Sequence, residues 1–125
     1  MSEEVAASQT ATSGGRKFDG GKVRYELLPP FALEDVAKVL TYGSVKYEDE
    51  NWRVVPEALR RYRGALMRHI EEYRKGIIFD EETGLPHMAH AICCAMFILE
   101  LDRVQYDDKA RALHEEIVNA FKDKE

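Results

Sequence analysis

Three of the four histidines, His69, His87 and His90, fall in one short region that is also rich in carboxylates. His69 and Glu72 are three residues apart, as are His87 and His90, so each pair shares one face of a helix. If the two helices run antiparallel across a tight loop, the pairs can converge on one point, as in the carboxylate and histidine metal sites of helical bundles. Mixed nitrogen and oxygen ligands suit a borderline divalent cation. The spacing therefore predicts a metal site.

Each of these residues also has an ordinary structural interpretation. A histidine in the first turn of a helix often makes only a local hydrogen bond, and His87 follows Pro86, where that role is easy. Glu71 and Glu72 can equally be a solvated pair that offsets neighbouring basic residues. The occurrence of two matched pairs across one loop favours the metal site.

A second group of residues is basic and aromatic. Glycines are interleaved with Lys and Arg in the segment 16–24, which contains Arg16, Lys17, Lys22 and Arg24. Flexible glycines with basic side chains suit the wrapping of a polyphosphate. Further along the chain, Lys46 precedes Asn51 and Trp52. In one loop, a Trp can stack on a base while an Asn forms hydrogen bonds with the edge of that base. The alternative, which these residues alone favour, is an irregular arm with a Trp that plugs the end of a bundle.

Charge is unevenly distributed along the chain. Residues 53–75 contain seven basic and three acidic residues, whereas residues 77–125 contain eleven acidic and five basic ones. Such asymmetry indicates an anionic substrate on the basic side, pairing of unlike surfaces between subunits, or merely a solvated helix face. The whole chain has a formal net charge of -5. That balance argues against general binding to nucleic acid or to an anionic membrane.

Apolar periodicity predicts four helices and an all-α fold. We expect them at residues 30–42, 56–75, 86–104 and 107–121, with Gly43 and Gly76 as stops and Asp107 or Asp108 as the last N-cap. Residues 1–15 are expected to form a disordered tail, and residues 16–125 a single domain. Within its irregular arm, residues 23–27 could form at most a short strand.

The third predicted helix is apolar on all sides at residues 91–99, which is typical of a helix buried all round. That run is too short to span a bilayer. The aromatic content of so small a chain also indicates apolar surface buried between subunits, so we expect a homo-oligomer. Cys93 and Cys94 are adjacent and are expected to be reduced core residues. No signal peptide is apparent, so we expect a cytoplasmic protein, in the host cytoplasm if it is viral.

Together these segments resemble the all-α NTP pyrophosphohydrolases of the MazG type. The resemblance is closer to the phage and bacterial dATP/dGTP diphosphohydrolases, including the MazG-like enzyme of phages that replace adenine by diaminopurine. It rests on KFDGGKVRYELLPP, YGSVKYEDENW, RHIEE and DEETGLPHMAHAICCAMFIL, which lie between residues 16 and 101. The usual pattern is EExxE on one helix and ExxD on the next. Here RHIEE places Arg68, His69 and Glu72 at the first three acidic positions, and HMAH places His87 and His90 at the last two.

The resemblance implies a four-helix MazG-like bundle that hydrolyses a purine deoxynucleoside triphosphate, dGTP slightly before dATP, to the monophosphate and pyrophosphate. It implies Mg²⁺ or Mn²⁺ as cofactor and assembly as a dimer or tetramer with sites near the subunit interfaces. The implied metal ligands are His69, Glu71, Glu72, His87 and His90. A carboxylate, Glu72 or Asp80, would position or deprotonate the water. The implied substrate-binding residues are Lys17, Lys22, Arg24, Lys46, Asn51 and Trp52.

Other interpretations remain open at this point. In a second alignment, Glu34 and Asp35 supply the acidic pair. An HD-type phosphohydrolase requires an adjacent His-Asp pair, which the sequence does not contain. The main alternative is a helical adaptor, or a nucleotide-binding protein without catalytic activity. Such a protein has no reason to direct several histidines at one interior point.

Overall fold

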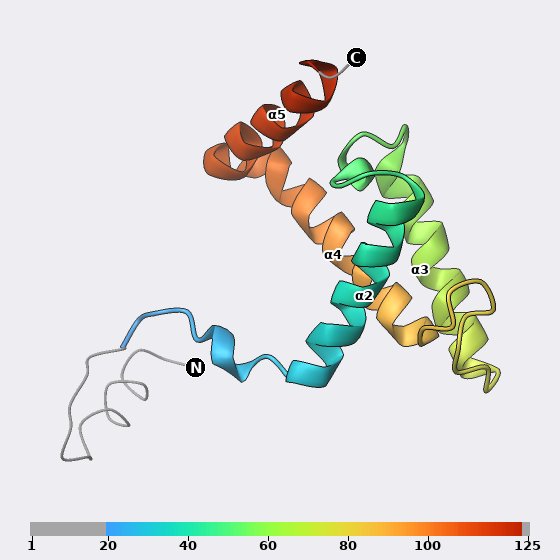
Figure 1. Cartoon of the computed structure of the whole chain (residues 1–125). Coiled ribbons are helices and arrows are strands. Elements are labelled where there is room, and N and C mark those ends of the chain that lie inside the picture. The colour runs from blue at the N-terminus through green and yellow to red at the C-terminus, as the bar shows by residue number, and fades with distance from the viewer. Residues whose placement is uncertain (1–19, 124–125) are drawn as a thin grey trace.

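The computed structural model describes residues 20–123, and these residues form an all-α fold (Figure 1). The elements in order are η1 (Tyr25–Leu27), α2 (Pro30–Lys46), η2 (Asn51–Arg53), α3 (Ala58–Arg74), α4 (His87–Tyr106) and α5 (Asp108–Asp123), where η denotes a 3₁₀ turn. The prediction of four helices is confirmed. Within the described residues no strand is present, and a lone β-bridge between Phe79 and Pro86 closes the α3–α4 loop.

Helices α3 and α4 form the antiparallel hairpin that positions the histidines (Figure 1). Helix α3 ends where Gly76 adopts a φ of 93°, a left-handed conformation that glycine enters without strain. Pro86 then precedes α4, and the backbone N–H of His87 donates to the carbonyl of Ile78 at 2.7 Å. This bond fixes the first turn of α4 against the loop.

Helix α2 crosses α4 (Figure 1) and buries Val36 against the bundle. The segment that follows α2 returns to α4 through η2, where Trp52 stacks on Phe97 with ring centroids 4.7 Å apart. The ring therefore plugs this end of the bundle, as the structural interpretation of Trp52 expected.

Helix α5 folds back at the far end of α4 (Figure 1). Asp107 caps it, because its side chain accepts a hydrogen bond from the backbone N–H of Ala110 at 3.0 Å. The side chain of Arg53, only 6% exposed, reaches α5 and lies 3.0 Å from Nδ1 of His114. Arg53 also pairs with Glu50 and approaches Glu100. It therefore joins η2, α4 and α5.

Two details of the sequence-based prediction are wrong. Helix α2 does not stop at Gly43, because the backbone N–H of Tyr47 donates to the carbonyl of Gly43 at 2.9 Å and the helix runs on to Lys46. A glycine ends a helix only where its backbone turns left-handed, and Gly43 does not. The segment 23–27 contains a 3₁₀ turn, which agrees with the expectation of an irregular arm with at most a short strand. The expected tail, residues 1–15, lies outside the described residues.

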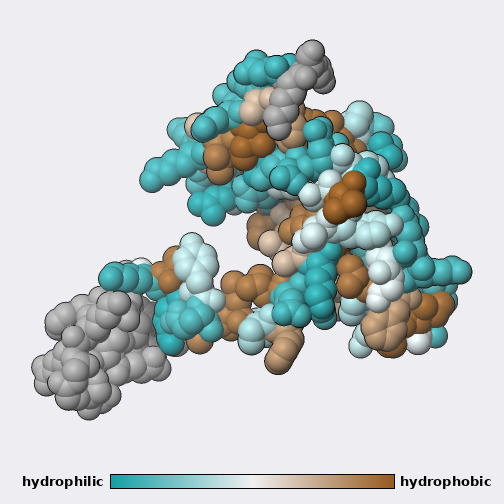
Figure 2. All heavy atoms as spheres, viewed as in Figure 1, coloured by the Kyte–Doolittle hydropathy of each residue, from teal (hydrophilic) through white to brown (hydrophobic). Residues whose placement is uncertain are grey.

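The second error concerns the burial of α4, which was expected to be complete on all sides. Its buried residues are mostly small, namely Ala89, Ala91, Cys93 and Cys94. Another side of the helix is open, and Leu99 is 66% exposed. The reason is that α2, α3 and α5 cover only part of the helix surface. Figure 2 shows hydrophobic residues open to solvent around the notch between α5 and the start of α2. None of the helices in residues 20–123 is both long and apolar enough to cross a membrane.

Candidate metal and phosphate site

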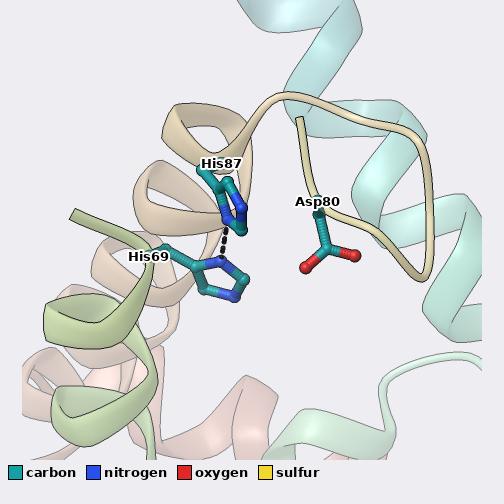
Figure 3. Close-up of side chains that lie close together, drawn as sticks. All are labelled: His69, Asp80 and His87. Atoms are coloured by element: carbon teal, nitrogen blue, oxygen red, sulfur yellow. Dashed lines mark hydrogen bonds between the residues drawn. The ribbon is translucent and has the colours of Figure 1, made fainter. Parts of the chain in front are cut away.

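His69, Asp80 and His87 form a cluster of potential metal ligands (Figure 3). They come from α3, the α3–α4 loop and the first turn of α4, and one donor atom of each lies within 4.8 Å of the others. The Nδ1 atoms of His69 and His87 are 2.9 Å apart. His87 is the one buried polar side chain among residues 20–123. The predicted convergence of histidines from two antiparallel helices is therefore present.

The loop holds Asp80 in place through its own backbone. One carboxylate oxygen, Oδ1, accepts hydrogen bonds from the backbone N–H groups of Glu82 and Thr83, each at 2.9 Å. Gly84 has a φ of 72° and donates its N–H to the carbonyl of Asp80, which closes the turn. Partial burial opposes ionisation, but the bonds from Thr83 and the nearby His90 hold the pKa of Asp80 below its usual value. Asp80 is therefore ionised near neutral pH.

His90 supports this cluster from one side. Its ring stacks on His69, with centroids 4.7 Å apart and planes 11° apart. Its Nε2 lies 2.7 Å from the hydroxyl of Thr83, whose Oγ1 also lies 3.3 Å from Asp80 Oδ1. Thr83 therefore links His90 to the turn that carries Asp80. His90 is outside the three-residue group, and one of its two ring nitrogens is already engaged.

The surroundings of His69 and His90 favour their neutral rings. Burial, together with the neighbouring rings of His90 and His87, lowers the pKa of His69. Burial also lowers the pKa of His90, although Asp80 opposes that shift. Neutral imidazoles offer a lone pair to a cation.

The donor set fits a divalent cation of the borderline class, because it combines two imidazoles with one carboxylate. The 2.9 Å between the two Nδ1 atoms is close to the roughly 3 Å expected between adjacent nitrogens bound at about 2.1 Å from one ion at right angles. Without an ion, the same distance suits one N–H···N hydrogen bond. The rings therefore already point at a common position.

The cluster separates two hollows in the surface. The larger, of about 1560 Å³, is walled by the C-terminal half of α2, by η2 and by parts of α3 and α4. It exceeds the roughly 300–1,000 Å³ of typical small-molecule sites. The smaller, of about 540 Å³, lies toward the C-terminal end of α3 and shares Ala65, Arg68, His69 and Asp80 with the larger. His69 and Asp80 line both hollows, whereas His90 lines only the larger one and His87 only the smaller one.

The two glutamates predicted as ligands line the smaller hollow beside the cluster. Glu72 accepts a hydrogen bond from Lys75 at 2.8 Å, and this bond is the main cause of its lowered pKa. Glu71 is exposed and pairs with Arg74 at 3.0 Å. The structure thus brings Glu72 near the histidines but directs Glu71 at an arginine. Of the alternative acidic pair, Glu34 forms an exposed ion pair with Lys38.

Only some of the residues predicted to bind substrate line the larger hollow. The larger hollow is lined by Lys46, Asn51 and Trp52. Lys46 is held by Glu82 at 2.6 Å, and Arg53 lies over the ring of Trp52 at 4.3 Å from its centroid. The arm residues Lys22 and Arg24 line neither hollow, and Arg24 pairs with Glu26. Lys17 lies outside the described residues.

Two features of the site were missed in the sequence. The hydroxyl of Thr83 joins Asp80 to His90, and Glu82 ties the loop to Tyr42 and Lys46 of α2. The run Asp-Glu-Glu-Thr-Gly at residues 80–84 contained the necessary information, because an Asp that accepts N–H groups two and three residues later, followed by Gly, forms a compact turn.

Comparison with known proteins supplies independent information. A family model described as dATP/dGTP diphosphohydrolase, N-terminal, matches residues 12–111. A curated relative from Salmonella phage PMBT28, named dATP/dGTP diphosphohydrolase, is 41% identical over 97 residues. The match covers 76% of this chain and 33% of the relative, so the chain spans about a third of that protein's length. No solved structure matches the chain significantly.

Proposed function

Because the chain belongs to the family of the dATP/dGTP diphosphohydrolase N-terminal domain, we propose that it hydrolyses a purine deoxynucleoside triphosphate to the monophosphate and pyrophosphate. The observation that carries this proposal is the cluster of His69, Asp80 and His87, which lies between two hollows, one large enough for a nucleotide. The substrates named for the phage relative are dATP and dGTP. We propose dGTP as the preferred substrate.

His69, Asp80 and His87 would hold a divalent cation, which would neutralise charge on the phosphate oxygens and acidify the attacking water. A set of two imidazoles and one carboxylate favours Mn²⁺ over Mg²⁺, because Mg²⁺ prefers oxygen ligands alone. His90 would help to position these ligands, because its ring stacks on His69 and its Nε2 is hydrogen-bonded to the hydroxyl of Thr83.

Glu72 is the proposed general base. It lines the same hollow as Asp80 and His87, and its Oε1 is occupied by Lys75 while Oε2 can accept a proton. The water oxygen attacks the α-phosphorus, and the bond from that phosphorus to the oxygen bridging to the β-phosphate breaks. Pyrophosphate leaves with this oxygen, and the proton of the water passes to Glu72.

The nucleoside would occupy the larger hollow. Asn51 lines it and can hydrogen-bond the edge of a base, and Trp52 lines it with its ring in contact with Phe97 and Arg53. Lys46 can bind a phosphate once it exchanges Glu82 for the ligand.

Self-association is part of the proposal. The open side of α4 carries an apolar stripe at helical spacing, formed by Met88, Ile92 and Leu99. A second copy of the chain is the proposed cover, since an apolar helix face of this length is stabilised by burial at about 25 cal/mol per Å².

The test is pyrophosphate release from a panel of eight ribo- and deoxyribonucleoside triphosphates, with Mn²⁺, Mg²⁺ or EDTA. We expect release with the purine deoxynucleotides, fastest with Mn²⁺ and absent with EDTA. Binding of triphosphates without turnover would instead support the non-catalytic nucleotide-binding alternative. Release of orthophosphate would contradict the proposed bond cleavage.

A further inference from the structure

Two arginines of α3, Arg61 and Arg68, face the larger hollow without an acidic partner. Three other basic side chains of the same wall are already paired: Lys46 with Glu82, Arg53 with Glu50, and Arg60 with Glu57. Within residues 20–123, no carboxylate forms an ion pair with Arg61 or Arg68. These two guanidinium groups are therefore available to an anionic ligand.

Their spacing places them on one face of the helix, next to the metal cluster. Arg61 and Arg68 are seven residues apart, which is two turns and a rise of about 10.5 Å along the axis. Between them on this face lie Gly64 and Ala65, which also line the hollow, and His69 follows Arg68 directly. This face of α3 therefore carries small residues between two arginines, and the cluster lies beside Arg68.

Gly64 has a specific relation to Arg68. A Cβ added at Gly64 would lie 3.1 Å from Nη1 of Arg68 and 3.9 Å from its Cζ, so the guanidinium rests over the glycine. A helical side chain that points back toward the N-terminus covers the preceding turn in this way. Glycine in the middle of a helix is unfavourable relative to alanine. The presence of glycine at this position is explained if the guanidinium of Arg68 must lie over residue 64 in order to function.

We propose that Arg61, Gly64 and Arg68 form the binding site for the phosphate chain of a nucleoside triphosphate. The chain would lie along α3 with its α-phosphate, the group that reacts, toward His69. This inference rests on the proposed function and names the residues that hold its substrate. Arginine suits the role because its planar guanidinium donates two parallel hydrogen bonds to phosphate oxygens. The predicted phosphate ligands of the arm, Lys22 and Arg24, line neither hollow, so α3 supplies cations that the arm does not.

The test compares Arg61→Gln and Arg68→Gln with a matched control, Arg63→Gln. Arg63 is on the same helix and is also exposed, but it lines neither hollow. The probe is α,β-methylene-dATP, a triphosphate that cannot be cleaved at the α-phosphorus, and binding is measured by calorimetry with Mn²⁺. We expect the first two variants to bind about 10- to 100-fold more weakly than the wild type, and the control to bind within about twofold of it.

A second variant tests the role of Gly64 separately from folding. Alanine at this position favours the helix but displaces the guanidinium, so Gly64→Ala should melt no lower than the wild type while its affinity for the probe falls. Wild-type affinity in both arginine variants, or an equal loss in all three, would overturn the inference. If the wild-type protein hydrolyses triphosphates but the arginine variants bind normally, only this inference fails. If the wild type neither binds nor hydrolyses them, the proposed function fails as well.

Discussion

The Nδ1 atoms of His69 and His87 lie 2.9 Å apart, although the two residues belong to different helices and are separated by the α3–α4 loop. The pair depends on the loop, because the backbone N–H of His87 is bonded to the carbonyl of Ile78. Asp80 follows in the same loop and completes a set of two nitrogens and one oxygen. The geometry of the loop therefore decides whether these residues can hold a metal.

Replacing Asp80 tests the metal cluster directly. Asp80→Asn removes the charge of the carboxylate while it keeps the size of the side chain, so we expect the affinity for Mn²⁺ to fall by at least about 100-fold. Calorimetric titration of the chelator-treated protein with MnCl₂ measures this change. Glu81→Gln is the control, because Glu81 is an exposed neighbour that lines neither hollow. If both variants lose the same affinity for Mn²⁺, the loss reflects net charge alone, and Asp80 is not a specific ligand.

The hydroxyl of Thr83 is expected to matter for the same affinity. Thr83→Val removes the bond to His90 and the contact with Asp80, so we expect Mn²⁺ to bind about tenfold more weakly. Thr83→Ser retains the hydroxyl and should bind Mn²⁺ like the wild type. If Thr83→Val binds Mn²⁺ with unchanged affinity, the hydroxyl of Thr83 does not contribute to metal binding.

The contact between Arg53 and His114 predicts a pH dependence of stability. Arg53 donates to Nδ1 of His114 at 3.0 Å, which requires a neutral ring. Burial and the charge of Arg53 lower the pKa of His114 in the folded protein, despite the opposing charge of Glu100. The unfolded chain therefore binds a proton at His114 more readily than the folded protein does. The contribution of His114 to stability is complete above its unfolded pKa of about 6.5 and is lost as the pH falls toward the folded pKa.

Urea unfolding of the wild type and His114→Gln at pH 7.5 and pH 5.5 measures this contribution. The comparison cancels the titration of His69 and His90, whose pKa values are also lowered. We expect the difference in free energy of unfolding between the two proteins to be smaller at pH 5.5. Parallel pH profiles would contradict the proposed coupling.

The open side of α4 predicts self-association through a defined stripe. Leu99→Glu places a charge on its most exposed member and should shift the mass in solution toward the monomer. Light scattering coupled to size-exclusion chromatography measures the mass at micromolar concentration. Leu113→Glu on α5 is the control, since Leu113 is similarly exposed but lies outside the stripe. If the wild-type protein is monomeric at this concentration, the proposed self-association is wrong.

Much of the fold follows from local rules, and the exceptions have physical causes. Proline at the start of α2 and the left-handed glycine after α3 were identifiable because each satisfies a local backbone requirement. Gly43 was misassigned because a glycine inside a helix and one that ends it are alike in composition. The burial of α4 was overestimated because an apolar sequence does not show how much of a helix surface the neighbouring helices cover.

The candidate site was predictable only in part. The convergence of His69 and His87 followed from their helical positions and the short loop. The place of Asp80 beside them could not be derived, because it depends on a left-handed Gly84 and on hydrogen bonds within the turn. Likewise, the unpaired state of Arg68 depends on which acidic residues find other partners, and spacing alone does not determine that.

The most direct measurement follows the hydrolysis of dGTP in water enriched in ¹⁸O, with Mn²⁺, by ³¹P NMR and mass spectrometry. The wild-type protein should release unlabelled pyrophosphate and dGMP that carries the label, whereas Asp80→Asn should release neither. Labelled orthophosphate with dGDP, or equal turnover by Asp80→Asn, would contradict the assignment of this cluster to cleavage at the α-phosphorus.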